Sequence, residues 1–531
     1  MDEQTDQTPQ PDETALSQCP MGTDGVRRRA LLAGATGAVV ASVGGLALSS
    51  EAGAVAGAAS PAEAAGPAKR WAHAAGVLRG SDVAVRAGRD KEGRFGVMFK
   101  DAQGFAPPDD LLTKLAAQMG EPDSQNPFDL DNPRVPAGFT FLGQFIDHDM
   151  TLDRTPVPDQ EVDPLALTNF DTPLFDLGSL YGRGPDRDPG LYEPGGTGRM
   201  RVVRNEHGVD DLPRQADGTA LVGDHRNDEN LIISQLHLLF AKFHNRCLDT
   251  GVARTLADAQ RLTRWHFQWI IVHDFLERLV GADVVARFLD GRGKVKREFY
   301  KPKNPHRPMM PIEYSVAAYR FGHSMVRAAY LMNARTTPPV VAPIFGAEGA
   351  DLRGSRPLPA RLEIDWQHFF DVPGRPAGPR NQARRIDTKL SRPLFDLPAT
   401  VVADAMTSLA ERNLLRGKRL GLPAGQDVAT RMGVTALTNT QLGLPDPANP
   451  GWSGKAPLWF YILRESELQA NGERLGAVGG RLVAEVILGI LDADKASYLH
   501  ARPDFVPAQP IATTKGTFLM GDLITFAQGL R

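Results

Sequence analysis

The sequence of 531 residues is poor in cysteine, with only Cys19 and Cys247. This count excludes a disulfide framework, an iron–sulfur cluster held by four thiolates, and a structural zinc site built on four cysteines. Histidine is present at twelve copies. Any metal that the protein binds must therefore be held by histidine and carboxylate side chains.

The sequence also lacks a surplus of positive charge. Its 60 Lys and Arg residues are outnumbered by 63 Asp and Glu residues, for a formal net charge of −3. Proteins that bind nucleic acid need a basic surface for the phosphates, so this balance argues against a nucleic-acid partner. A long, strongly apolar run is missing as well, and we expect no stable membrane span.

The amino-terminal part of the sequence has the order of a bacterial export signal. Residues 1–26 are polar and acidic, Arg27–Arg29 follow, and an Ala/Gly/Val run continues to Leu48. Paired arginines before such a run are typical of the twin-arginine route, so the export machinery is an expected partner and the protein is expected to be secreted. A transmembrane anchor is the alternative, although the run is short for one. We expect an acidic lead with a twin-arginine signal peptide over 1–60, a linker or surface arm over 61–90, and one folded domain over 91–531.

The remainder of the sequence favours helices. Apolar residues recur at three- and four-residue spacing, while alternating strand patterns are scarce. The fold class predicted is mainly α, a single large helical domain with long irregular loops and little sheet. The expected helices cover 108–119, 137–150, 229–249, 253–290, 312–329, 396–410, 426–435, 456–470, 475–491 and 518–529.

Four polar clusters interrupt these apolar patterns, and each has an ordinary interpretation when taken alone. A surface turn, a helix cap, a core histidine or a helix end would account for them one at a time. Gly322 in the third cluster costs about 1 kcal/mol relative to alanine within a helix. A flat partner pressed against the backbone beside His323 would explain that cost. The clusters are Gly143–Asp149, Gly223–Asn230, Tyr319–Met325 and Arg412–Gly417.

In this order the four clusters resemble the animal-type haem peroxidases of the peroxidase–cyclooxygenase superfamily, and the chain looks like a bacterial exported member. Three further segments strengthen the resemblance. Asp176–Gly182 resembles the calcium loop of the family, His237–Asn245 its long-helix signature, and Trp459–Gly480 the carboxyl-terminal region of its bacterial members. The resemblance implies one helical haem-peroxidase domain that covers nearly all of the chain after the signal.

The resemblance also implies roles for individual residues. His148 matches the distal histidine, which does general acid–base work on hydrogen peroxide. Arg226 matches the distal arginine, whose charge stabilises the breaking O–O bond. Gln144 matches the distal glutamine, which holds water or a small anion.

On the other side of the haem, His323 matches the proximal ligand of the iron. The free N–H of such an imidazole needs an acceptor, and Asn413 matches the residue that supplies it. Arg320 matches the arginine that pairs with a haem propionate. Asp147 and Glu229 match the two carboxylates that form ester bonds to the haem methyl groups, so haem b with covalent links is the expected cofactor.

A calcium ion is a further expectation from the resemblance. Oxygen ligands with several carboxylates suit this cation. Gly178 departs from the pattern, because animal members place a serine hydroxyl there. The matching ligands are Asp149, Thr172, Leu174 through its carbonyl, and Asp176.

The function implied is a peroxidase that reduces hydrogen peroxide and oxidises halides or small organic donors. A fatty-acid dioxygenase of the same superfamily is the first alternative, but it needs a tyrosine three residues before the proximal histidine, where Arg320 stands. A non-catalytic matrix or adhesion protein is the second. His237 and His244 lie seven residues apart in an apolar segment and are interpreted as packing or capping residues rather than a metal pair.

Overall fold

The computed structural model describes residues 95–121, 130–151, 173–347, 349–375, 378–399, 401–402, 405–444 and 451–530. The chain divides into two units, Met1–Pro61 and Ala62–Arg531, and every described residue belongs to the second. The expected export signal and linker therefore lie outside the described residues.

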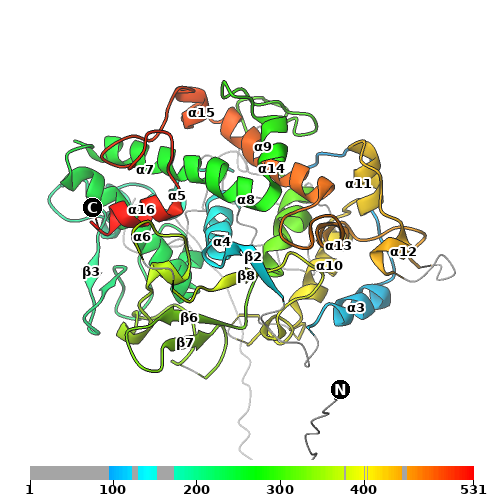
Figure 1. The fold of residues 1–531 in the computed structure, drawn as a ribbon, viewed down its shortest axis with the longest axis horizontal. Helices are drawn as coiled ribbons and strands as arrows, with labels where there is room; N and C mark the ends of the chain where they lie inside the picture. The colour runs from blue at the N-terminus through cyan, green and yellow to red at the C-terminus, as the bar shows by residue number, and fades with distance from the viewer. Residues whose placement is uncertain are drawn as a thin grey trace, which may run out of the picture. The chain divides into compact units, whose positions relative to one another are not determined.

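Helices dominate the described part of the chain, as Figure 1 shows, and the mainly helical fold class is confirmed. Long irregular segments connect them. The helices are α3 (Asp109–Gln118), α4 (Gly138–Met150), α5 (Gly178–Tyr181), α6 (Leu231–Asp249), α7 (Leu256–Ile270), α8 (Glu277–Val280), α9 (Ala282–Phe288), α10 (Leu409–Arg419), α11 (Gly425–Arg431), α12 (Asn439–Leu442), α13 (Leu458–Ala470), α14 (Ala477–Ala493), α15 (Tyr498–Ala501) and α16 (Met520–Ala527).

The strands among the described residues are short and form two-stranded sheets only. One pair is parallel and joins segments far apart in the sequence, β1 (Phe95–Gly96) with β5 (Met310–Pro311). Three pairs are antiparallel: β2 (Asp131–Pro136) with β8 (Gln382–Arg384), β3 (Val203–Arg204) with β4 (Asp210–Asp211), and β6 (Ala329–Asn333) with β7 (Val340–Pro343).

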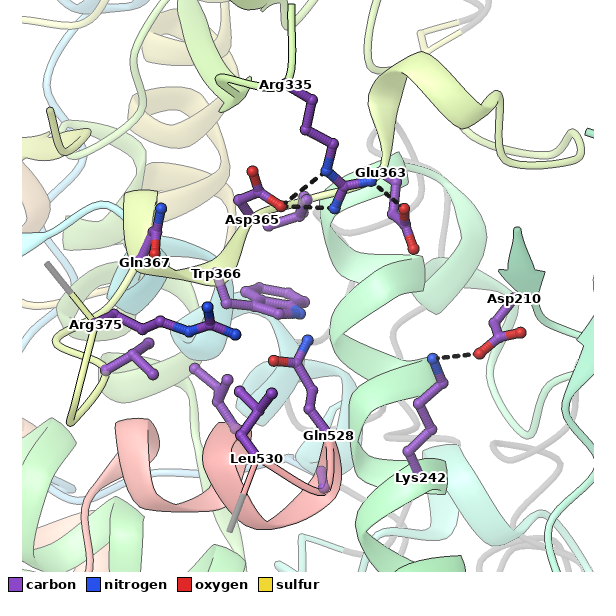
Figure 2. A pocket seen from close by; sticks show the side chains of 14 residues that line it. Asp210, Lys242, Arg335, Glu363, Asp365, Trp366, Gln367, Arg375, Gln528 and Leu530 are labelled. Atoms are coloured by element: carbon purple, nitrogen blue, oxygen red, sulfur yellow. Dashed lines mark hydrogen bonds and ion pairs between the residues drawn. The ribbon is translucent and has the colours of Figure 1, made fainter. Parts of the chain in front are cut away.

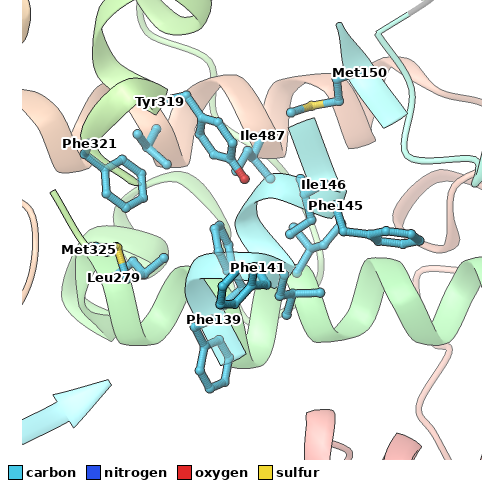
Figure 3. Packing of buried hydrophobic residues seen from close by; sticks show 14 of the residues in the cluster. Phe139, Phe141, Phe145, Ile146, Met150, Leu279, Tyr319, Phe321, Met325 and Ile487 are labelled. Atoms are coloured by element: carbon cyan, nitrogen blue, oxygen red, sulfur yellow. The ribbon is translucent and has the colours of Figure 1, made fainter. Parts of the chain in front are cut away.

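Helix α4 is fixed in the apolar core by aromatic contacts. The ring of Phe145 stacks on Phe240 of α6, with centroids 5.0 Å apart, and meets Phe267 of α7 edge-on at 5.9 Å. Aromatic pairs of this kind contribute about 0.5–1.5 kcal/mol each beyond their buried area. Figure 3 shows the α4 aromatic residues packed together with Tyr319 and Phe321. The core therefore holds the polar end of α4 in one position.

The prediction of a helix over 396–410 is wrong. Helix α10 instead begins at Leu409, and Ser408 caps it by accepting the Glu411 N–H at 3.3 Å. A serine followed three residues later by glutamate is a helix-start signal, and it prevails here over the apolar spacing before it. The Arg412–Gly417 cluster consequently lies inside a helix rather than at a helix end.

The helix predicted over 312–329 is also corrected. The segment forms a π-helix, η6 (Glu313–Ala317), and then a 3₁₀ helix, η7 (Ala318–His323), before strand β6 begins at Ala329. The fully buried Glu313 carboxylate accepts the backbone N–H groups of Met98 and Phe99, at distances of 3.0–3.1 Å. These contacts hold η6 in place.

The segment 253–290 is likewise not one continuous helix. A π-helix, η5 (Ile271–Leu276), separates α7 from α8, and Gly281 at φ +94° divides α8 from α9. Such a φ is strained for any residue with a side chain. In the described ranges, no helix combines the length and the apolar character needed to cross a bilayer.

Candidate active site

His148 lies in the last turn of α4 and is almost completely buried. Its Nδ1 atom is 2.9 Å from Oδ1 of Asn227. Burial lowers the pKa of His148 to about 4, and the positive charge of Arg226 lowers it in the same direction. The imidazole is therefore neutral near pH 7 and can accept a proton at Nε2, as a general base must.

Asn227 connects His148 to a second histidine. Its Nδ2 atom is 3.1 Å from Nδ1 of His237 on α6, and the Asn227 side chain has no solvent exposure. Asn227 has no role in the predicted site, and His237 was expected to be a packing or capping residue. A histidine in the mainly apolar first half of α6, shortly after the Arg226–Glu229 cluster, was the sequence feature that could have pointed to this contact.

Arg226 is part of the 3₁₀ helix η4 (His225–Asp228) and is fixed from two sides. Its guanidinium contacts the Asp224 carboxylate, with a shortest distance of 2.7 Å. Nη2 also donates to the His148 carbonyl oxygen at 3.2 Å and to the Thr151 carbonyl oxygen. Burial alone would lower the pKa of Arg226, but the Asp224 carboxylate outweighs burial and raises it. A permanent positive charge is thus held beside His148.

Three of the predicted site residues are accessible to solvent. Gln144 is exposed, 32% of the Asp147 side chain is accessible, and so is 55% of the Glu229 side chain. The Asp147 carboxylate is 4.0 Å from Nη1 of Arg226. Although water reaches Glu229, the surrounding protein desolvates its carboxylate and raises its pKa. A cavity of about 550 Å³ borders Glu229, a volume within the range of small-molecule sites.

His323 is the last residue of η7, and α10 supplies its partner. The side-chain amide of the buried Asn413 contacts His323, with 2.8 Å between Nδ2 and Nδ1. Rotating the amide by 180° places its oxygen at the same point, so the pair supports either tautomer of the ring. Burial lowers the pKa of His323 to about 3, with a further contribution from the charge of Arg320. The ring is neutral, and Nε2 is its remaining ligating atom.

The His148 and His323 sides of the site are neighbours in space. The Tyr319 hydroxyl of η7 donates to the Gly143 carbonyl of α4 at 3.1 Å. A methyl group built on Gly322 would meet no atom of any other part of the chain within 4 Å, although the preceding residue, Phe321, is buried. Arg320 donates from Nε to the Ser315 carbonyl at 2.9 Å. Open space beside Gly322 and His323 fits a flat cofactor, as the sequence led us to expect.

The calcium ligands are brought together only in part. The buried Asp149 carboxylate accepts the Leu177 N–H at 2.7 Å and the Ser179 N–H at 3.1 Å. Asp176 accepts the Gly178 N–H in the same turn, at 3.0 Å. Leu174 precedes this turn, and Thr172 lies outside the described residues. Across the described residues, no group of three or more His, Cys, Asp or Glu side chains gathers as a metal site, and calcium stays a prediction.

A second cavity, of about 540 Å³, is lined by α6, α16 and the 363–375 segment. Figure 2 shows two groups of ion pairs among the side chains that line it. Lys242 contacts Asp210 at 2.8 Å, and Arg335 contacts both Glu363 and Asp365. Histidine is missing from the lining residues that the structure describes, so this cavity does not offer the acid–base chemistry of the His148 site.

Known proteins resemble this chain in sequence and in fold. Two curated relatives are a chorion peroxidase of Aedes aegypti, 29% identical over 152 residues, and a peroxidase-like protein of Margaritifera margaritifera, 28% identical over 185 residues. These matches cover 25% and 31% of this chain. They span only 19% and 22% of the relatives' own lengths.

Solved structures share the fold at low sequence identity. Peroxidase A from Dictyostelium discoideum matches with a TM-score of 0.55 and 15% identity, covering 77% of this chain and 90% of that one. A fatty acid alpha-dioxygenase of Arabidopsis thaliana matches with a TM-score of 0.54 and 14% identity, covering 78% and 75%. The animal haem peroxidase family model matches residues 134–441, more than half of the chain, and includes all the predicted site residues. The chain therefore belongs to the animal haem peroxidase family.

Proposed function

We propose that this protein is a haem-dependent peroxidase that reduces hydrogen peroxide and oxidises halides or small organic donors. One observation carries the proposal: a neutral His148 and a permanently charged Arg226 are held together by the Arg226–His148 carbonyl contact of 3.2 Å. This pair has the two functions that heterolysis of a peroxide requires, a base that becomes an acid and a fixed positive charge.

The residues on both sides of the site fit a haem. His323 would hold the iron through Nε2, with Asn413 as the partner of its other ring nitrogen. Arg320 would pair with a propionate, and the accessible carboxylates of Asp147 and Glu229 would reach the haem edge. Haem b, when bound, would supply the two electrons that reduce hydrogen peroxide and would regain them from the donor. Gly322 leaves the space that such a flat group needs.

The protein residues move one proton during the peroxide reaction. Nε2 of His148 takes it from one oxygen of hydrogen peroxide and delivers it to the other, which leaves as water when the O–O bond breaks. General acid–base catalysis of this type contributes about 10²–10⁴-fold in rate. The charge of Arg226 stabilises the departing oxygen, and a single such donor contributes about 3–4 kcal/mol. Gln144 would hold a water or a small anion in the remaining space.

Two further parts of the proposal concern calcium and export. Asp149 and Asp176 would bind calcium in the turn that follows residue 172, with Leu174 as a carbonyl ligand. Removing calcium with a chelator should lower the thermal stability of the protein, and an Asp149→Asn variant should not respond to the chelator. Arg27–Arg29 would direct export, which replacement of Arg28 and Arg29 by lysine should block in a cell-fractionation assay.

The experiment that tests the main proposal compares two arginine variants of the haem-loaded protein. Arg226→Gln should slow peroxide-dependent donor oxidation by roughly 100- to 1,000-fold without loss of the Soret absorption of bound haem. Arg297→Gln is the control, because Arg297 is paired with Asp492 at 2.8 Å and has a similar exposed fraction. Equal activity of the Arg226→Gln and wild-type proteins would exclude the assigned role.

A fatty-acid dioxygenase is the second candidate, because the fold neighbours include such enzymes, although Tyr319 lies four residues before His323 and not three. Tyr319 belongs to η7, next to the proposed haem site, and its ring stacks on Tyr314 with 4.8 Å between centroids. Its hydroxyl is held by the Gly143 carbonyl. Oxygen uptake with a long-chain fatty acid, lost in Tyr319→Phe, would support this candidate. Absence of both activities would favour the non-catalytic alternative.

A further inference from the structure

We propose that Asn227 and His237 are positioning residues that hold His148 in the single tautomer able to accept a proton from hydrogen peroxide. This inference rests on the proposed peroxidase function and extends it to two residues outside the predicted site. Both side chains are buried, at 0% and 2% exposure, and neither would contact the peroxide directly.

The contact between His148 and Asn227 determines where the imidazole carries its proton. Oδ1 of Asn227 is only an acceptor, so the 2.9 Å contact requires a proton on His148 Nδ1. A neutral imidazole carries one proton, and Nε2 is then left with its lone pair. Nε2 is the atom that faces the substrate in the proposed function. The opposite tautomer would present an N–H there and could not act as the base.

The contact with His237 couples the tautomer of its ring to the orientation of the Asn227 amide. Nδ2 of Asn227 is a donor, so the 3.1 Å contact requires an unprotonated Nδ1 on His237. Turning the amide by 180° would place two acceptors together at one contact and two donors at the other. A buried polar group without a partner is costly, so both histidines would have to exchange tautomers before the amide could turn.

Both positioning residues are held by rigid elements. Asn227 shares η4 with Arg226, and Asp224 caps this 3₁₀ helix. The next residue, Asp228, is buried and forms an ion pair with Arg214, with contacts of 2.8 and 3.0 Å. The His237 ring lies edge-on to Phe145 of α4, at 6.3 Å between centroids. One short helix thus presents the distal arginine and the amide that orients the distal histidine.

The first measurement reads the tautomer directly and does not depend on turnover. Nitrogen-15 labelling of histidine in the haem-loaded protein, in its diamagnetic ferrous carbon monoxide form, distinguishes protonated from unprotonated ring nitrogens by chemical shift. We expect His148 to carry its proton on Nδ1 in the wild type. In Asn227→Leu, we expect a signal from the Nε2-protonated tautomer. The same spectrum of the haem-free protein provides the result even if haem binding fails.

The second measurement compares the rates at which hydrogen peroxide oxidises the bound haem. Asn227→Leu should be slower by roughly 10- to 100-fold, since orientation is part of the acid–base contribution. Asn245→Leu is the matched control: Asn245 is another buried asparagine, whose amide holds the backbone of Met200 at 2.8 and 2.9 Å. This control should keep the wild-type rate and tautomer, whatever it loses in stability.

Variants of His237 separate positioning from packing. His237→Gln retains an acceptor for the Asn227 amide and should preserve both the tautomer and most of the rate. His237→Leu removes the acceptor, frees the amide to turn, and should give a mixture of tautomers with an intermediate rate. A wild-type His148 tautomer in Asn227→Leu would overturn the proposal. So would an equal loss of rate in Asn245→Leu. A correct tautomer pattern without peroxide chemistry would instead reject the peroxidase function alone.

Discussion

The open space beside Gly322 predicts two opposite effects of a Gly322→Ala substitution. The stability of the haem-free protein should be kept or raised, and the affinity for haem should fall. Gly322 lies in η7 next to His323, and a methyl group at its Cα would meet no atom within 4 Å. Its backbone is helical, so Gly322→Ala introduces no strain. Replacing glycine by alanine in a helix stabilises it by up to about 1 kcal/mol. The haem-free variant should therefore be as stable as the wild type or slightly more stable.

The same methyl group should weaken haem binding. If the haem lies against the backbone beside His323, the added carbon overfills that contact, and overpacking costs about 1–3 kcal/mol. This cost corresponds to a loss of roughly 5- to 150-fold in haem affinity. Thermal unfolding of the haem-free protein and titration with haem, followed at the Soret band, measure the two effects separately.

Gly291→Ala is the control for this experiment. Gly291 also has no atom within 4 Å of a built methyl group, and it lies in the loop between α9 and β5. Its replacement should leave haem affinity unchanged. Wild-type haem affinity in Gly322→Ala would refute the reasoning, because the haem could not then occupy the space beside Gly322.

Three further predictions concern the distal side. After treatment with hydrogen peroxide, acidified organic solvent should fail to extract the haem from the wild type but should extract it fully from an Asp147→Asn, Glu229→Gln double variant. The rate of the peroxide reaction should be constant from roughly pH 5 upward and should fall as the pH drops through about 4. The reason is that the lowered pKa of His148 keeps its imidazole neutral down to that pH. Stopped-flow measurement at each pH checks this. Gly354→Ala would place its methyl carbon 1.8 Å from the Asp228 carbonyl oxygen and break two backbone hydrogen bonds. Urea denaturation should therefore show a free energy of unfolding that is lower by about 2 kcal/mol.

The sequence predicted well where the pattern is local. Helices α4 and α6 match the expected segments to within two residues, because their apolar faces continue for several turns. The candidate site residues were named from their motifs, and their roles stay predictions. That Arg226 lies beside His148, and Asn413 beside His323, is a finding of the structure, since these pairs are separated by 78 and 90 residues.

Prediction failed where the backbone leaves the regular helix. The segment from Glu313 to His323 has the apolar spacing of an α-helix but forms a π-helix followed by a 3₁₀ helix. The type of helix depends on long-range contacts that a local sequence pattern cannot reveal. The main one is the contact of the buried Glu313 carboxylate with the backbone N–H of Met98. Asn227 was missed for the same reason. Its role depends on two histidines that are 79 and 10 residues away.

The structure gives η4 a larger role than its four residues suggest. Arg226 and Asn227 come from this one 3₁₀ helix, and Glu229 follows directly after it. The backbone beyond η4 is tied to the 352–355 segment, where Gly354 N–H donates to the Glu229 carbonyl at 2.9 Å and Ser355 N–H to the Asp228 carbonyl at 2.7 Å. The Arg226 charge, the Asn227 amide and the Glu229 carboxylate are all anchored by these two hydrogen bonds. A shift of η4 would therefore disturb all three together. We therefore expect variants that loosen this anchor, such as Gly354→Ala, to impair peroxide chemistry and covalent haem attachment in parallel.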